Sequence, residues 1–170
     1  GLAMSVVAAD GQDVRPVAVD EFQFGPGETY DVIVTPSEDK AFTVVGETVD
    51  RSGMALATLA PRPGMRAAVP PRRRRPVLTM KDMGMEMEGH DMSGMSMRDG
   101  SRAPQVKLGP GVDMINPMPM DRTGDPGIGL DPAYVGQDHK VLVYKDLVAL
   151  EANPDVRAAE REIMVHLTGA

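Results

Sequence analysis

The sequence contains no cysteine and no tryptophan, and aromatic residues make up only 4% of its 170 residues. The lack of cysteine excludes disulfides, zinc–thiolate sites and thiol catalysis within this chain. A core without large aromatic side chains has to be built from Val, Leu, Ala and Met. No run of about 18 apolar residues occurs, so no segment is predicted to span a membrane.

Charge is distributed unevenly along the chain. Residues 1–60 carry ten acidic and three basic side chains, whereas residues 61–79 carry six Arg and no acid. The formal net charge of −7 disfavours nucleic acid as a partner. The run Arg72–Arg75 has the composition of a nucleic-acid patch. The prolines around it and the acidic character of the whole chain favour a solvated spacer instead.

The first 60 residues have the pattern of short strands separated by turns. Apolar or alternating runs are interrupted by turn sequences such as Asp10-Gly11 and Gly25-Pro26-Gly27. Strands this short, about ten residues apart, are typical of a β-sandwich. The predicted strands are 4–9, 14–24, 30–34, 41–45 and 54–59.

A long segment without strand patterns follows, and we predict an irregular linker over residues 63–136. Prolines fix the backbone of its first part in an extended form. Residues 81–105 contain no Leu, Ile, Val, Phe, Tyr or Trp, and Met is their only large apolar side chain. They cannot bury enough surface to offset the entropy of ordering, so they are expected to be disordered without metal. Strand patterns resume at 140–144 and 163–167. The sequence therefore predicts an all-β chain with one domain in 1–62 and the start of another in 137–170.

Half of the 14 methionines lie between Met80 and Met97, together with one of the three histidines. A thioether is a soft, neutral ligand that suits Cu(I) and does not suit Mg²⁺ or Ca²⁺. It carries no titrating proton, so it still binds at low pH. We predict a copper site from eight residues of this segment: Met80, Met83, Met85, Met87, His90, Met92, Met95 and Met97.

Two other interpretations of these methionines stay open, a linker with no role and a hydrophobic docking stripe. Core methionines recur at helical or strand spacing among aliphatic residues, whereas Gly and acids separate these, which favours copper binding. Met114, Met118 and Met120 form a weaker second group among prolines. His139 and His166 have no second His two residues away and are predicted to be structural. No Ser/His/Asp set, phosphate loop or carboxylate dyad is present.

Several stretches resemble the bacterial copper-resistance multicopper oxidases, and they occur in the same order as in that family. The early ones are similar to the end of a middle cupredoxin domain, and the late ones to the approach to the third. Asp50–Arg62 and Leu78–Met85 are more specific to the copper-resistance branch. The other stretches are 7–12, 17–22, 27–34, 109–114, 125–130 and 166–169.

The resemblance implies cupredoxin-like β-sandwich fragments, joined by the Pro/Met-rich linker, in a periplasmic oxidase with copper as cofactor. In such enzymes a blue copper takes electrons from the substrate, here Cu(I), and a trinuclear copper cluster reduces O₂ to water. Their copper sites use His-x-His pairs and a His-Cys-His motif, which this sequence lacks, so the catalytic ligands and any export signal are expected outside it. The alternative is a stand-alone periplasmic copper-binding or chaperone protein without oxidase activity.

Overall fold

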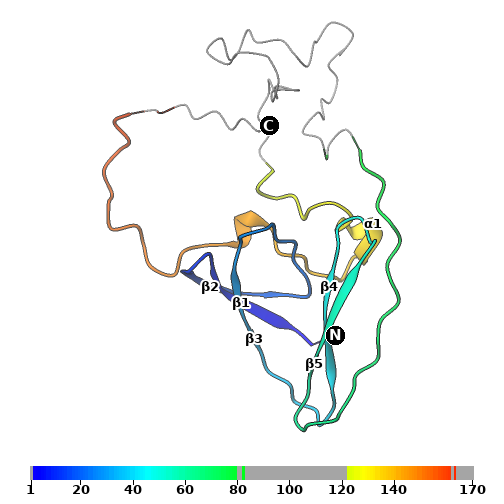
Figure 1. The fold of residues 1–170 in the computed structure, drawn as a ribbon. Helices are drawn as coiled ribbons and strands as arrows, with labels where there is room; N and C mark the ends of the chain where they lie inside the picture. The colour runs from blue at the N-terminus through cyan, green and yellow to red at the C-terminus, as the bar shows by residue number, and fades with distance from the viewer. Residues whose placement is uncertain (1, 80–81, 83–121, 162, 164–170) are drawn as a thin grey trace, which may run out of the picture. The chain divides into compact units, whose positions relative to one another are not determined.

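The computed structural model describes residues 2–79, 82, 122–161 and 163 (Figure 1). The regular structure of these residues is almost entirely β, which confirms the all-β prediction. None of their helices is long and apolar enough to cross a membrane. In chain order the elements are β1 (Met4–Ala9), β2 (Gln12–Val19), β3 (Tyr30–Val34), β4 (Phe42–Glu47), β5 (Met54–Leu59), the helix α1 (Pro132–Val135) and the 3-10 helix η2 (Tyr144–Asp146).

The chain divides into two compact units, 1–78 with 122–152, and 79–121 with 153–170. The first unit contains all the strands that the structure describes, together with α1 and η2. The described residues of the second unit, 79, 82, 153–161 and 163, include no strand. The predicted division into 1–62, 63–136 and 137–170 stays a prediction.

A three-stranded antiparallel sheet in the order β2-β1-β3 contains the core of the first unit. Asp10 and Gly11, with φ of 47° and 74°, form the tight turn between β1 and β2. A register shift between Val6 and Ala8 bends β1 against both neighbours. Val6 is fully buried and packs with Val14 and Val19 of β2. The alternation of β1 thus places its apolar side chains in one cluster.

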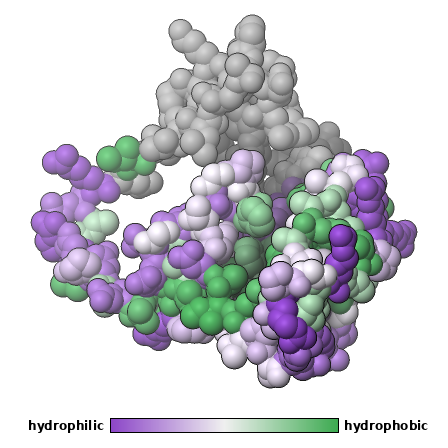
Figure 2. Space-filling model, turned by 60° about the horizontal axis from the view of Figure 1, so that its bottom comes forward, coloured by the Kyte–Doolittle hydropathy of each residue, from purple (hydrophilic) through white to green (hydrophobic). Residues whose placement is uncertain are grey.

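Strands β4 and β5 pair as a separate antiparallel hairpin, with Phe42 opposite Leu59 and Glu47 opposite Met54. Many of its apolar side chains are exposed, including Val44, 56% exposed, and Leu56, 44% exposed. Apolar surface is also visible on the face of the molecule drawn in Figure 2. A two-stranded hairpin is only marginally stable alone. The segments that contact the ends of this hairpin are therefore needed to stabilise it.

Neither of the two strands predicted after the linker is among the described strands, β1 to β5. The strand predicted at 140–144 is wrong, because Val141 makes only an isolated bridge to Glu21 and the chain then turns into η2. The turn forms because the carboxylate of Asp146 accepts hydrogen bonds from the backbone N–H of Val143 at 3.2 Å and from the Lys140 ammonium at 2.8 Å. The strand predicted at 163–167 lies outside the described residues apart from Ile163, which is not in a strand.

Candidate functional site

All of the predicted copper ligands lie outside the described residues. They are Met80, Met83, Met85, Met87, His90, Met92, Met95 and Met97, and the weaker group at 114, 118 and 120 lies outside as well. Within the part of the chain that the structure describes, no cluster of three or more His, Asp or Glu side chains could hold a metal ion. The copper site therefore stays a prediction.

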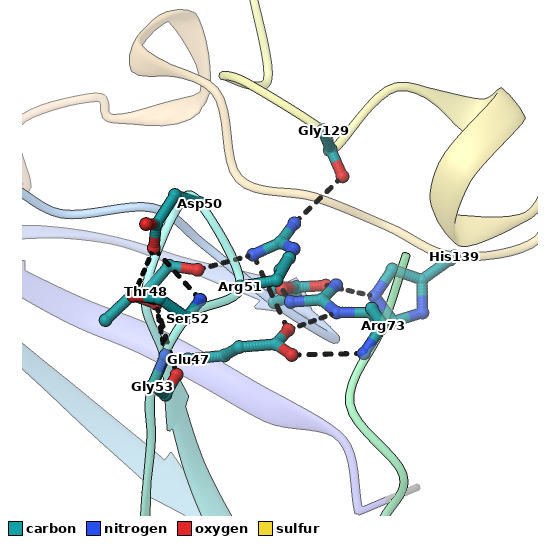
Figure 3. A network of polar contacts seen from close by, with 10 residues as sticks. Glu47, Thr48, Asp50, Arg51, Ser52, Gly53, Arg73, Gly129 and His139 are labelled. Carbon is teal, nitrogen blue, oxygen red and sulfur yellow. Dashed lines mark hydrogen bonds and ion pairs between the residues drawn. The ribbon is translucent and has the colours of Figure 1, made fainter. Parts of the chain in front are cut away.

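The main polar feature of the described residues is a charged cluster formed by Glu21, Glu47, Arg51, Arg73 and His139 (Figure 3). Its members come from the end of β4, the loop after it, the residues after β2, the proline-rich segment and the segment before η2. The chain thus brings together five side chains that span more than a hundred residues of sequence.

Arg73 lies at the centre of this cluster. Its guanidinium donates to both carboxylate oxygens of Glu21, at 2.6 and 2.8 Å, and its Nε donates to Oε2 of Glu47 at 2.7 Å. Its backbone N–H also donates to Glu47. The prediction of a solvated spacer is therefore wrong for Arg73, although Arg72 and Arg74 are exposed. The negative charge of the acidic residues in 1–60 attracts this arginine, and the bidentate hydrogen bonds between its guanidinium and the carboxylate of Glu21 hold it in place.

Glu21 also contacts His139, whose Nε2 lies 3.1 Å from Oε2 of the carboxylate. One carboxylate thereby joins residues on both sides of the methionine-rich segment. His139 takes part in an ion-pair cluster within the described residues, in line with its predicted structural role.

Arg51 is the most buried charged residue of the cluster, with 8% of its surface exposed. Its guanidinium donates to the carbonyl oxygens of Thr48 at 3.3 Å and Gly129 at 3.2 Å, and lies 3.5 Å from Glu47. Its Nε has no hydrogen-bond partner. Arg51 has a φ of 61°, a conformation that is rare outside glycine. In this backbone conformation the side chain of Arg51 points inward, where its contacts with Thr48, Gly129 and Glu47 offset the strain.

Hydrogen bonds within the loop after β4 hold Arg51 in place. Asp50 accepts from the backbone N–H of Ser52 at 3.0 Å and from its hydroxyl at 2.7 Å, and Gly53 donates to the Thr48 hydroxyl at 2.9 Å. The hydrogen bonds from Ser52 are the main reason why the pKa of Asp50 falls to about 2. The loop is therefore built around a carboxylate that stays ionised.

The electrostatics of Glu47 and Arg73 favour the charged forms of these two side chains. Burial raises the pKa of Glu47, but hydrogen bonds from Arg73 and the charges of Arg73 and Arg51 outweigh it and leave the pKa below its usual value. Burial lowers the pKa of Arg73, but Glu21 and Glu47 outweigh this effect and raise it. The cluster is thus a set of matched charges, suited to fastening segments together and without a nucleophile or a redox group.

Two glycines allow the segment after the methionines to approach closely. A Cβ on Gly127 would lie 2.1 Å from Oε1 of Gln23, and one on Gly129 would lie 2.9 Å from Cβ of Pro76. Both have positive φ, 99° and 70°. The sequence showed these glycines in the stretch 125–130, but only the structure shows what they contact.

Comparison with known proteins shows which proteins the chain is similar to. The Multicopper oxidase family model matches residues 1–63. Copper resistance protein A of Escherichia coli is 38% identical over 99% of this chain. The copper resistance protein A homolog of Pseudomonas syringae pv. tomato, strain ATCC BAA-871 / DC3000, is 39% identical over 99% of the chain. Residues 1–63 thus match the multicopper oxidase family, and the chain as a whole is similar to copper resistance proteins A.

The chain spans about a third of the length of those curated relatives, 35% of the first and 33% of the second. The alignments run over 216 and 200 residues, more than the 170 of this chain, so the relatives contain residues that have no counterpart here. No solved structure matches the chain significantly.

Proposed function

We propose that this chain is part of a periplasmic multicopper oxidase for copper resistance. The whole enzyme would oxidise Cu(I) to Cu(II) at copper cofactors and reduce O₂ to water, a reduction that consumes four electrons and four protons for each O₂. The observation that carries the proposal is the 38% identity to a copper resistance protein A over 99% of the chain. Every described strand lies within residues 1–63, which the family model matches.

The catalytic copper ions would be held by parts of the enzyme beyond this sequence. A blue copper site needs a cysteine thiolate with histidines, and this chain has no Cys and only three His. The described residues of the chain would contribute scaffold, the end of one cupredoxin-like domain. A further domain would begin within 137–170.

We further propose that the methionine segment binds copper. Seven thioethers and one imidazole would supply soft ligands for Cu(I) between Met80 and Met97. Because the segment would be tethered to the oxidase, it would raise the local concentration of the substrate ion. This is the contribution of the chain's own side chains to the chemistry of the whole enzyme.

The test measures O₂ uptake with Cu(I) as the reductant, in metal-free buffer to which only copper is added. The longer polypeptide that contains this sequence is compared with the 170-residue chain. We expect Cu(I)-dependent uptake by the longer protein and none by the chain alone. Turnover by the chain alone would overturn the assignment of catalysis to the missing parts. Absence of uptake by the copper-loaded longer protein would favour the alternative, a copper-binding or chaperone protein.

A further inference from the structure

The segment that follows the methionines enters the core built by the first strands. Leu142, 7% exposed, belongs to the same buried cluster as Val6, Val14 and Val19. Val141 beside it is 8% exposed. Burial of this Leu side chain removes its apolar surface from water and so stabilises the contact. This is the packing of a core residue rather than of a surface contact between domains.

Backbone hydrogen bonds tie the segment both to the first half of β2 and to the residues that follow this strand. Asp20 donates to Lys140, and Leu142 donates to Glu21, at 2.8 and 3.0 Å. Further along, Arg15 donates to Val148 at 2.8 Å and Leu150 donates to Asp13 at 2.9 Å. The segment 140–150 therefore covers part of the outer edge of β2, which the three-stranded sheet leaves without a neighbouring strand.

The charged cluster adds ion pairs and hydrogen bonds that also hold this segment against the strands. Arg73, before the methionine segment, and His139, after it, meet on the single carboxylate of Glu21. Arg51 reaches from the loop after β4 to the carbonyl of Gly129. Both flanks of the methionine segment are thus bound to the same sheet unit.

We infer that residues 122–152 are an integral part of the domain formed by β1 to β5, so that any further domain begins after Ala152. The methionine segment then leaves one folded domain and returns to the same domain, rather than connecting two. The inference rests on the packing of Leu142, the hydrogen bonds to β2 and the cluster at Glu21, and it holds whether or not the segment binds copper.

Hydrogen exchange of the full chain tests the inference without any substitution. The amide of Leu142, which donates to Glu21, is expected to exchange as slowly as the amides of β1, within about tenfold. Exchange of Leu142 at the rate of an unstructured peptide, while β1 stays protected, would overturn it.

A cut chain provides the second test. A specific protease sequence is inserted between Gly100 and Ser101 of the full chain, and the cut protein is passed over a size-exclusion column. We expect the two pieces to elute together in native buffer and to separate in denaturant. Separation of the wild-type pieces in native buffer would contradict the inference.

Two leucines of the docked segment give a matched pair of variants for the cut chain. Leu142→Ala removes a buried side chain and is expected to weaken the association of the pieces by at least about tenfold. Leu150→Ala removes a side chain that is 54% exposed and should leave the association within about threefold. Equal effects of the two substitutions would sink the assignment of Leu142 to a shared core.

Discussion

At the scale of single residues, the feature with the clearest consequence is the carboxylate of Glu47. Its side chain is 4% exposed and faces two guanidiniums, those of Arg73 and Arg51. A buried charge is tolerated only where it is paired and hydrogen-bonded. The two arginines supply that pairing, and they hold the pKa of Glu47 below its ordinary value of 4.5 although burial alone would raise it.

The acid dependence of stability follows from this lowered pKa. A carboxyl whose pKa is lower in the folded state stabilises the fold above its unfolded pKa, and this contribution disappears as pH falls through the folded pKa. We expect the free energy of unfolding to decrease below about pH 4.5. Glu47→Gln should lower stability at pH 7 by about 1–3 kcal/mol, because Arg51 loses a partner while buried. The free energy of unfolding of this variant should also depend less on pH below about pH 4.5 than that of the wild type.

Urea unfolding followed by circular dichroism at pH 7 and pH 3 measures both effects. The control is Glu38→Gln, since Glu38 is 61% exposed and pairs with the exposed Lys40. That change is expected to alter stability by less than about 0.5 kcal/mol. Equal losses in the two variants would refute the role given to Glu47.

The sequence predicted the strands better than it predicted this cluster. The charge contrast between residues 1–60 and 61–79 is visible in the sequence, but for the run Arg72–Arg75 the sequence predicts a solvated spacer. Nothing in that run marks Arg73 as the residue that pairs with carboxylates. Arg72 and Arg74 have the same chemistry as Arg73 and are exposed. The choice depends on where the extended segment passes Glu21 and Glu47, which is a property of the tertiary fold.

At the scale of elements, β1, β3 and β5 have the bounds that the turn signals predicted. β2 differs, because it ends at Val19 instead of continuing to Phe24. Asp20 and Glu21 hydrogen-bond to residues 140–142 in place of a strand partner. Phe22 packs its ring 4.9 Å from that of Tyr30, whereas Phe24 is 61% exposed. The alternation of apolar and polar residues in 14–24 could not show that the backbone of Asp20 and Glu21 pairs with residues more than a hundred positions later in the chain.

The loop 125–130 gives a prediction at this scale. Gly129 has a φ of 70°, and a Cβ there would meet Pro76 at 2.9 Å and Nη2 of Arg51 at 3.1 Å. Gly11 has a φ of 74° with nothing within 4 Å of an added Cβ. Gly129→Ala therefore adds a clash to the strain of positive φ, whereas Gly11→Ala adds the strain alone.

We expect Gly129→Ala to cost about 1–3 kcal/mol more than Gly11→Ala, because overpacking adds to the backbone strain. Thermal unfolding of the two variants beside the wild-type chain measures the difference. Similar losses would show that the loop does not lie against Pro76 and Arg51 as the structure has it.

At the scale of the whole molecule, the family and the all-β class followed from sequence. The arrangement of residues 122–152 did not. The turns of 122–139 give no sign of a place in the core, and the strand pattern at 140–144 predicts the start of a further domain. The predicted copper ligands lie outside the described residues, so the account of them rests on composition and ligand chemistry. Soft thioethers among Gly and acids favour Cu(I).

The most direct test of that account is a Cu(I) competition titration on the 170-residue chain. Six methionines are replaced by leucine, which keeps apolar bulk and removes sulfur: Met83, Met85, Met87, Met92, Met95 and Met97. The matched control replaces three methionines of the described sheet unit by leucine: Met4, Met54 and Met65. We expect the wild-type chain to bind Cu(I) more tightly than Zn²⁺ and to keep binding Cu(I) at mildly acidic pH. The affinity for Cu(I) should fall at least about tenfold in the first variant and stay unchanged in the control. Undiminished Cu(I) binding by the first variant would contradict it.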